Sequence, residues 1–397
     1  AAVASPGGCV MARSPLFGRR IHISGSISND LTIASTEDVD TARELVVKLV
    51  EKLVRAGATF VVPVDAEKKR DQDDRPFCFD WLVWQAVKDN IAKRPSGAPN
   101  PLAIAVQHHK SEDQIPPEMH QLWDELRGTD IVEIENASHW NMNGKRMELQ
   151  AKWGDILIAI GGAEGVTYLA NLYHDAGKHV VPLRAPLTPP GEGARKLFDI
   201  GLTSNKAGQL LRTESRTPHH WINQINFSNR TSVDERASTL IELLEDLEPP
   251  KAFAVRLLNP DHPEFGAVDD FFETIVQPIV EDEMGYRFTV IDGQQAFEHA
   301  RMDQEIFAKL HRSSLVIADI TGARPNCFLE LGYALGRSLP TIVTSCEDSE
   351  RPFDITTLSG LSWKTEGTIK DKKRAFREHY NAVRNRPPLV PMEPLIS

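Results

Sequence analysis

One stretch of the sequence, residues 314–336, combines the signals of a strand, a loop and a helix in that order. An apolar run over 315–320 is interrupted only by Asp319, and a loop that contains glycine and proline follows it. Apolar side chains then recur at helical spacing, which predicts a helix over about 326–336. Glu330 falls in the first turns of that helix, just beyond the carboxyl end of the strand, where ligands of open α/β sheets bind. The helix dipole predicts that its carboxylate stays ionised.

The same alternation of apolar runs and helix-period segments continues along most of the chain. It begins with a strand near 20–25, pauses at the proline pair 249–250, and starts again with a strand near 252–258. Strands that alternate with helices at this spacing form parallel sheets, and paired prolines are typical of a boundary. The sequence therefore predicts an α/β protein with two doubly wound parallel-sheet domains in series, Rossmann-like or flavodoxin-like. The pattern is weakest over 107–130 and 184–232.

Composition and charge narrow the class of protein. The 397 residues carry a net charge of −11 and give a pI near 5.7, which argues against a protein that coats duplex nucleic acid. The four cysteines form no CxxC pair, so no metal site or disulfide framework is expected, and a cytoplasmic location fits. No apolar run reaches the roughly 18 residues of a membrane helix, and residues 1–17 have the composition of a loose tail.

A glycine-rich loop follows the apolar run over 156–160. Its glycines let backbone N–H groups approach a phosphate, and the helix that follows supplies partial positive charge. Arg146, on the preceding helix, could reach the same phosphate with its guanidinium. The predicted phosphate pocket consists of Ser24, Gly25, Ser26, Arg146, Gly161, Gly162, Gly165 and Thr167.

The spacing of Arg146, the glycine loop and Thr167 resembles the SLOG superfamily, which includes the LOG cytokinin-activating phosphoribohydrolases. The resemblance implies a nucleotide-binding domain over 18–205, followed by a linker with a helix over 206–250. LOG enzymes carry a catalytic Glu shortly after the Thr, where this chain has Tyr168-Leu169-Ala170. The resemblance therefore implies a pocket that binds a nucleotide signal rather than hydrolysing it. Residual hydrolysis and a purely structural loop are the alternatives.

The string from Ala318 to Ala334 resembles the nucleoside 2-deoxyribosyltransferase and TIR-like superfamily, whose members read Ala-Asp-(Ile/Leu)-Thr-Gly, then Pro-Asn, then Glu-Leu-Gly-Tyr-Ala. The resemblance covers about 251–385 and implies a TIR-like domain over 251–397. In that superfamily, the Glu that matches Glu330 acts at the anomeric carbon of an N-glycoside. The resemblance also implies a catalytic role for Asp319 and substrate contacts from Asn326, Asp292 and Tyr333.

The number of carboxylates bears on the substrate. Cleavage of an N-glycosidic bond passes through an oxocarbenium-like transition state, which a carboxylate stabilises. A neutral base needs a proton donor as it leaves, whereas nicotinamide leaves NAD from a cationic pyridinium. Only Glu330 is strongly placed, which favours NAD as the substrate.

Together, the two resemblances imply an NAD glycohydrolase effector that acts in antiphage defence and is gated by a nucleotide signal of the cyclic ADP-ribose type. NAD is then a substrate, and no cofactor or metal is expected. A nucleoside or nucleotide N-glycosidase or 2-deoxyribosyltransferase is the first alternative, and a non-catalytic nucleotide-binding scaffold is the second. A homo-oligomer is expected, without membrane or duplex nucleic acid as a partner.

Overall fold

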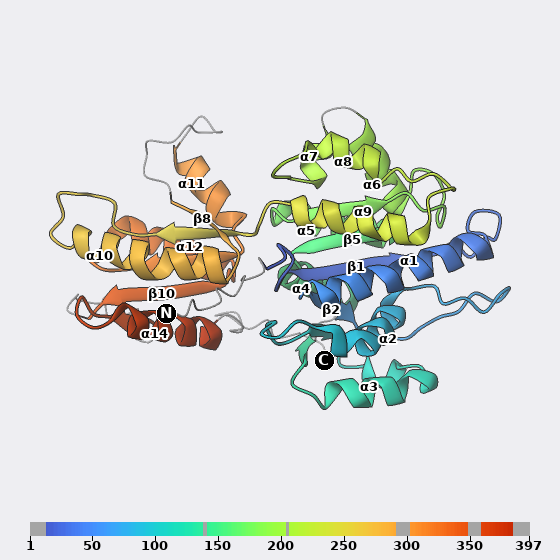
Figure 1. The fold of residues 1–397 in the computed structure, drawn as a ribbon, viewed down its shortest axis with the longest axis horizontal. Coiled ribbons are helices and arrows are strands. Elements are labelled where there is room, and N and C mark those ends of the chain that lie inside the picture. The colour runs from blue at the N-terminus through green and yellow to red at the C-terminus, as the bar shows by residue number, and fades with distance from the viewer. Residues whose placement is uncertain (1–12, 138–140, 204–205, 291–301, 348–358, 384–397) are drawn as a thin grey trace, which may run out of the picture. The chain divides into compact units, whose positions relative to one another are not determined.

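A computed structural model gives the structure of the protein and describes residues 13–137, 141–203, 206–290, 302–347 and 359–383. The chain divides into two compact units (Figure 1). The first unit consists of residues 1–171 and 179–247, and the second of residues 172–178 and 248–397. The domain bounds expected from the two resemblances stay a prediction.

A six-stranded parallel sheet forms the centre of the first unit. The strand order is β4-β3-β2-β1-β5-β6, and all neighbouring strands run parallel. Strands β2, β3 and β5 are buried along their whole length and β1 is buried over 21–23, as expected for a sheet with helices on both faces. The strands are β1 (Arg20–Ser26), β2 (Thr59–Pro63), β3 (Ala103–Gln107), β4 (Val132–Asn136), β5 (Ile156–Gly161) and β6 (His179–Leu183).

The helices of this unit begin and end where the sequence supplies caps. α1 begins after Ser35, whose side chain accepts a hydrogen bond from the backbone N–H of Asp38, and α9 begins with a capping box formed by Ser232 and Glu235. The two helices contact each other. The helices are α1 (Thr36–Arg55), α2 (Asp80–Asn90), α3 (His120–Arg127), α4 (Met142–Trp153), α5 (Glu164–Asp175), α6 (Gly193–Leu202), α7 (Ala207–Leu210), α8 (Pro218–Gln224) and α9 (Val233–Asp246).

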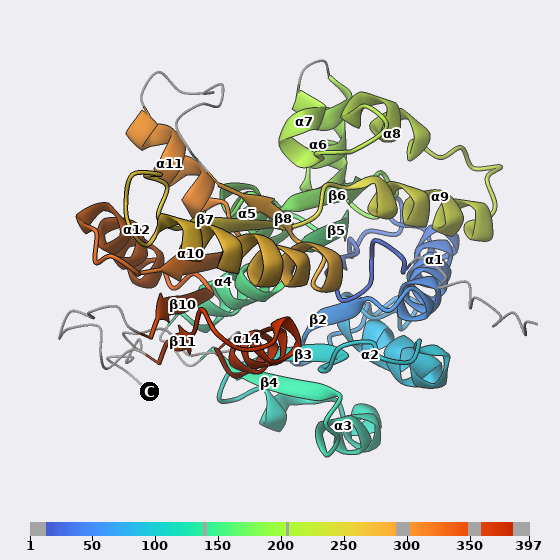
Figure 2. The same cartoon turned by 60° about the vertical axis from the view of Figure 1, so that its left-hand side comes forward.

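The second unit contains a five-stranded parallel sheet in the order β11-β10-β9-β7-β8. Apolar side chains pack on both of its faces. One cluster joins Phe272 and Phe376 to Trp363, and α14 lies beside β10 and β11 (Figure 2). The other joins Leu331 of α12 to Val316. The elements are β7 (Lys251–Val255), β8 (Arg287–Thr289), β9 (Leu315–Asp319), β10 (Thr341–Cys346), β11 (Leu361–Trp363), α10 (Phe265–Phe271), α11 (Met302–His311), α12 (Pro325–Gly336) and α14 (Ile369–Val383).

Two parallel sheets covered by helices confirm the predicted fold class. The structure also differs from the pattern in three places. The helical segment that follows β7 is not one regular α-helix, because α10 is followed by two π-helical turns, Phe272–Val276 and Ile279–Glu283. Strand β4 and helices α6 to α8 form in segments where no strand, or no regular element, was expected. Among the described helices, none combines the length and the apolar character needed to cross a membrane.

Candidate functional site

The strand order of the first unit creates a switch point between β1 and β5. The chain leaves β1 toward β2 on one side and reaches β5 on the other, so the carboxyl ends of β1 and β5 are neighbours. Ser26 pairs with Gly161 at this edge, and Gly25 pairs with Ile160. Ligands of doubly wound sheets bind at such a point. The predicted residues Ser24, Gly25, Ser26, Gly161 and Gly162 are therefore brought together.

Close backbone packing explains why glycine occupies this edge. A Cβ on Gly25 would lie 1.6 Å from the carbonyl oxygen of Ile160. Gly161 and Gly162 adopt positive φ angles of 63° and 72°, which favour glycine, and the N–H of Gly162 donates to the carbonyl of Ser26 at 2.7 Å. A Cβ on Gly193, at the start of α6, would lie 1.9 Å from the carbonyl oxygen of Gly162. The loop is fixed from two sides.

The start of α5 presents the remaining predicted residues of the loop. α5 begins at Glu164, so the amino end of a 12-residue helix follows the glycines directly, and Gly165 is exposed in its first turn. Thr167 donates its hydroxyl to the carbonyl of Ala163 at 3.4 Å, back along the helix. A glycine loop followed by the amino end of a helix is an arrangement that suits phosphate, and the predicted contacts of Gly165 and Thr167 with a phosphate stay a prediction.

Arg146 lies on α4 and forms an ion pair with Asp65, which follows β2. His108, at the end of β3, places Nε2 3.6 Å from a carboxylate oxygen of Asp65. Burial lowers the pKa of His108, and the charge of Asp65 opposes this. The guanidinium is therefore already engaged by a carboxylate, and its predicted contact with a phosphate stays a prediction.

Sequence analysis missed the acidic groups beside Arg146. Asp80, the first residue of α2, has a pKa raised to about 7, mainly by burial; Asp65 and Glu67 add to the rise, and Arg146 opposes it. Burial also raises the pKa of Glu67. Asp65 lies just after the apolar strand β2, and Asp319 lies at the end of the apolar strand β9. An acidic residue at the end of an apolar run is the sequence signal that could have identified Asp65.

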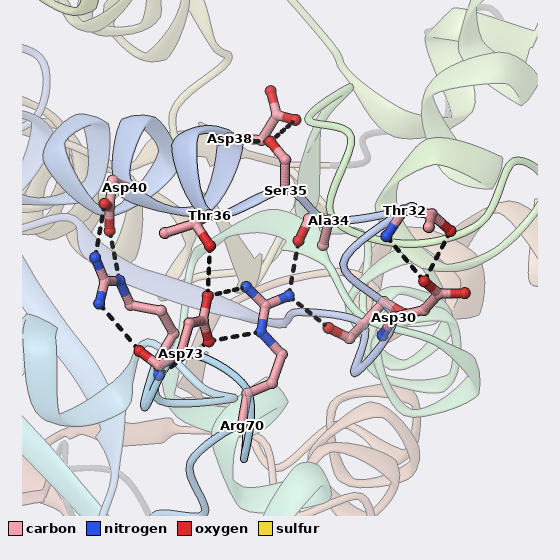
Figure 3. Close-up of polar contacts among 11 residues, drawn as sticks. Asp30, Thr32, Ala34, Ser35, Thr36, Asp38, Asp40, Arg70 and Asp73 are labelled. Carbon is pink, nitrogen blue, oxygen red and sulfur yellow. Dashed lines mark hydrogen bonds and ion pairs between the residues drawn. The ribbon is translucent and has the colours of Figure 1, made fainter.

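A buried ion pair holds the loop between β1 and α1 (Figure 3). Arg70 is 1 % exposed and pairs with Asp73. Its guanidinium also donates to the carbonyls of Ser28 and Ala34, at 3.2 and 2.7 Å, and Thr36 donates its hydroxyl to Asp73 at 2.7 Å. These contacts fix the backbone that continues from Ser26, next to the switch point.

The second unit has its own switch point between β7 and β9, where Asp319 ends β9. The Asp319 side chain is fully buried. Its carboxylate accepts hydrogen bonds from Thr321 N–H at 3.1 Å, the Thr344 hydroxyl at 2.7 Å and Trp363 Nε1 at 2.8 Å. Burial raises the pKa of Asp319, while these hydrogen bonds act to lower it. The contacts give Asp319 a structural role across β9, β10 and β11, and its catalytic assignment stays a prediction.

Glu330 is half-buried on α12, the helix that follows β9. Burial raises the pKa of Glu330, and the charge of Arg324 opposes the rise. Desolvation therefore opposes the ionisation expected from the helix dipole, and the ionised state of Glu330 stays a prediction. A carboxyl whose pKa is raised is closer to the range that suits general acid catalysis.

The other predicted substrate contacts are not all brought together: Asn326 and Tyr333 lie at different positions along α12. Asn326 is exposed in the first turn, four residues before Glu330 and therefore on the same face. The Tyr333 hydroxyl lies 2.8 Å from His311 Nδ1 of α11, so its polar end is engaged there. Asp292 lies outside the described residues. No group of three or more His, Cys, Asp or Glu side chains suited to a metal ion occurs in the described part of the chain.

The fold and its two switch points define a doubly wound α/β protein, with a glycine-rich loop at one switch point and a buried carboxyl, Asp319, at the other. Residues 16–244 match the family model described as "ATP nucleosidase Cap17-like, N-terminal", which covers more than half of the chain. The chain belongs to this family. The description names a nucleosidase, an enzyme that cleaves N-glycosidic bonds. No curated protein matches the chain.

Proposed function

We propose that the protein hydrolyses the N-glycosidic bond of a purine nucleotide of the ATP type. The observation that carries the proposal is the family match over residues 16–244, whose description names an ATP nucleosidase. The SLOG-like and TIR-like character of the two halves stays a resemblance, and so do the expected homo-oligomer and cytoplasmic location.

The proposed catalytic residue is Glu330. Adenine is a poor leaving group unless a ring nitrogen gains a proton as the bond to C1′ breaks, so a carboxyl that retains its proton suits this reaction. The raised pKa of Glu330 supports this role. After the proton is donated, the carboxylate stabilises the positive charge at C1′, and water completes the hydrolysis. Asn326, on the same face of α12, is proposed to contact the substrate.

NAD glycohydrolysis is the second candidate, and the motif from Ala318 to Ala334 supports it through its resemblance to TIR-like domains. Under either reaction, we propose that a nucleotide signal, of the cyclic ADP-ribose type, binds the glycine loop of the first unit and controls turnover. The amino end of α5 after Gly161 and Gly162 supports an anionic ligand there.

Full-length protein incubated with ATP and, separately, with NAD tests the proposal when adenine and nicotinamide are followed by chromatography. Adenine release is expected, and Glu330→Gln should lower it by about 10²–10³ because the donor and the charge partner are both lost. Glu366→Gln, at an exposed position, is the control and should match the wild type. Nicotinamide release without adenine would favour the second candidate. Release of neither, or full activity of Glu330→Gln, would contradict the proposed assignment.

A further inference from the structure

The start of α2 lies beside the carboxyl end of β1. Ile27 donates its N–H to the carbonyl of Phe77 at 2.9 Å, and Ser26 forms an antiparallel bridge with Cys78. Ser26 also pairs with Gly161 on its other side. Asp80 follows Cys78 by two residues, so Ser26 lies between the glycine loop and the segment that carries Asp80.

Asp80 is half-buried and forms no hydrogen bond or salt bridge within the residues that the structure describes. The charged groups that act on it are Arg146 of α4 and Asp65 and Glu67 after β2. Arg146 is held by Asp65, and Asp65 also accepts a hydrogen bond from Trp81 Nε1 through its backbone carbonyl at 2.9 Å. The neighbours of Asp80 are therefore fixed, while its own carboxyl is left to a ligand or to water.

A second buried polar group, the hydroxyl of Thr188, borders the edge formed by the carboxyl ends of β1 and β5. The loop between β6 and α6 packs against the continuation of β1, since Ser28 donates its N–H to the carbonyl of Leu187 at 2.7 Å. The next residue, Thr188, is 4 % exposed, and its hydroxyl has no hydrogen-bond partner in the described part of the chain. Buried polar groups are normally satisfied, so an unpaired hydroxyl beside the glycine loop is consistent with a polar ligand.

We propose that Asp80 is the adenine-selecting side chain of a nucleotide site at the β1–β5 switch point, with the phosphates of the nucleotide at the loop of Gly161 and Gly162. Asp65 already engages the guanidinium of Arg146 and Glu67 would repel phosphate, whereas the amino end of α5 attracts it. The nucleotide therefore lies with its base toward α2. The inference rests on the proposed nucleotide site at the glycine loop, and it names the base that this site selects; it does not rest on the role of Glu330. ATP serves as the adenine-bearing probe, and any ATP bound near Glu330 is common to the parent and the Asp80 variants, so the difference between them reports on the first unit.

The chemistry of a protonated carboxyl explains the selection. It offers one O–H donor and one acceptor oxygen, which match the N7 acceptor and N6 amino donor of adenine. Guanine presents two acceptors, N7 and O6, on the same edge and can satisfy only the donor. The raised pKa of Asp80, about 7, supports retention of the proton near neutral pH. An asparagine amide carries the same donor and acceptor pair at every pH.

Calorimetric titration of the full-length Glu330→Gln protein with ATP and with GTP, at pH 6 and pH 8, tests the inference. With a protonated form that binds and a pKa near 7, affinity for ATP should fall on the order of tenfold between the two pH values. Asp80→Asn should bind ATP with affinity close to that of the parent at pH 6 and should lose this pH dependence. The terminal phosphate of both nucleotides titrates in the same range of pH. The Asp80→Asn protein is therefore the reference, because any pH dependence of affinity that it retains comes from the phosphate and not from Asp80.

Asp80→Leu, which removes both hydrogen-bonding groups, should bind ATP at least about tenfold more weakly at pH 6. Asp89→Asn, on the exposed side of the same helix, should behave as the parent. Equal affinity for ATP and GTP at pH 6, the same pH dependence in the parent and Asp80→Asn, or unchanged binding by Asp80→Leu would each overturn the proposal. So would the absence of any nucleotide binding. Cleavage of ATP by the Glu330→Gln protein would instead count against the proposed catalytic role of Glu330.

Discussion

Single carboxyl groups in this protein differ in role according to the donors around them. Asp319 is surrounded by donors from three strands or their ends, whereas Asp80 and Glu330 are desolvated without hydrogen-bond donors of comparable number. A buried carboxylate that accepts several hydrogen bonds stabilises the fold, and one that lacks them tends to keep its proton. The same residue type therefore supports structure at one switch point, while Asp80 and Glu330 have surroundings that favour the proposed base recognition and proton transfer.

Asp319→Asn should destabilise the second unit by about 1–3 kcal/mol. The amide replaces one acceptor oxygen with a donor, so at least one of the groups on Thr321, Thr344 and Trp363 loses its partner inside the core. Urea denaturation followed by tryptophan fluorescence measures the change. The exposed Glu366→Gln variant should remain within about 0.5 kcal/mol of the wild type. Equal stability of Asp319→Asn and wild type would mean that the carboxylate does not hold the three strands together.

Asp80 should make the stability of the first unit depend on pH. Its pKa is raised from an ordinary value of 3.8 to about 7 in the folded protein, so the folded state binds the proton more tightly than the unfolded state. The stabilisation is complete below the ordinary value and is lost as the pH rises toward 7. Relative to wild type, Asp80→Asn should gain about 1–3 kcal/mol between pH 4 and pH 8. Denaturant titrations at both pH values measure this, with Asp89→Asn as the control; parallel curves for wild type and Asp80→Asn would contradict it.

At the scale of elements, the segments that border each switch point are fixed by contacts from distant parts of the chain. Arg70 donates to the carbonyls of Ser28 and Ala34, so the loop that leaves β1 is held by the loop that leaves β2. Gly193 at the start of α6 packs directly on the backbone of Gly162. The edge is therefore formed in advance of any ligand, which lowers the entropic cost of binding.

Arg70→Met should cost about 2–4 kcal/mol of stability, because it leaves two backbone carbonyls without a donor and removes the ion-pair partner of the partly buried Asp73. Arg75→Met is the matched control, since Arg75 pairs with Asp40 at 2.7 Å near the surface, where such a pair contributes no more than about 1 kcal/mol. Thermal denaturation of both variants provides the comparison. Similar losses of stability in Arg70→Met and Arg75→Met would show that the burial of Arg70 does not make its ion pair more stabilising than that of Arg75.

At the scale of the whole molecule, control of one unit by the other requires a ligand that binds the active arrangement more tightly. Turnover by full-length protein should rise when a cyclic ADP-ribose-type signal is added, and the ratio of stimulated to unstimulated turnover should fall to about one in Gly193→Ala. That change adds a Cβ 1.9 Å from the carbonyl oxygen of Gly162 and so disturbs the phosphate end of the site. Gly208→Ala, where a Cβ meets nothing within 4 Å, is the control. Undiminished stimulation of Gly193→Ala would contradict signal binding at this loop.

The sequence by itself determined the class of fold and the positions of the glycine loop and of α12, because apolar runs and helical period are local properties of the chain. Apolar runs marked β5 and β9, and the residues after them marked the glycine loop and α12. The pattern did not reveal β4, Val132–Asn136, since its alternating glutamates lack the apolar signal of a buried strand. Helices α6 to α8 were hidden for a related reason: short helices among many turn residues give little periodicity.

Only the tertiary structure decided what each side chain at those edges meets. The partner of Arg146 is Asp65, 81 positions earlier in the chain, and it becomes a neighbour because β2 and α4 pack together. The burial that raises the pKa of Asp80 and Glu330, and the three donors that surround Asp319, likewise come from elements distant in sequence. Electrostatic environment depends on strand order and on packing between layers, and a linear pattern of residues records neither.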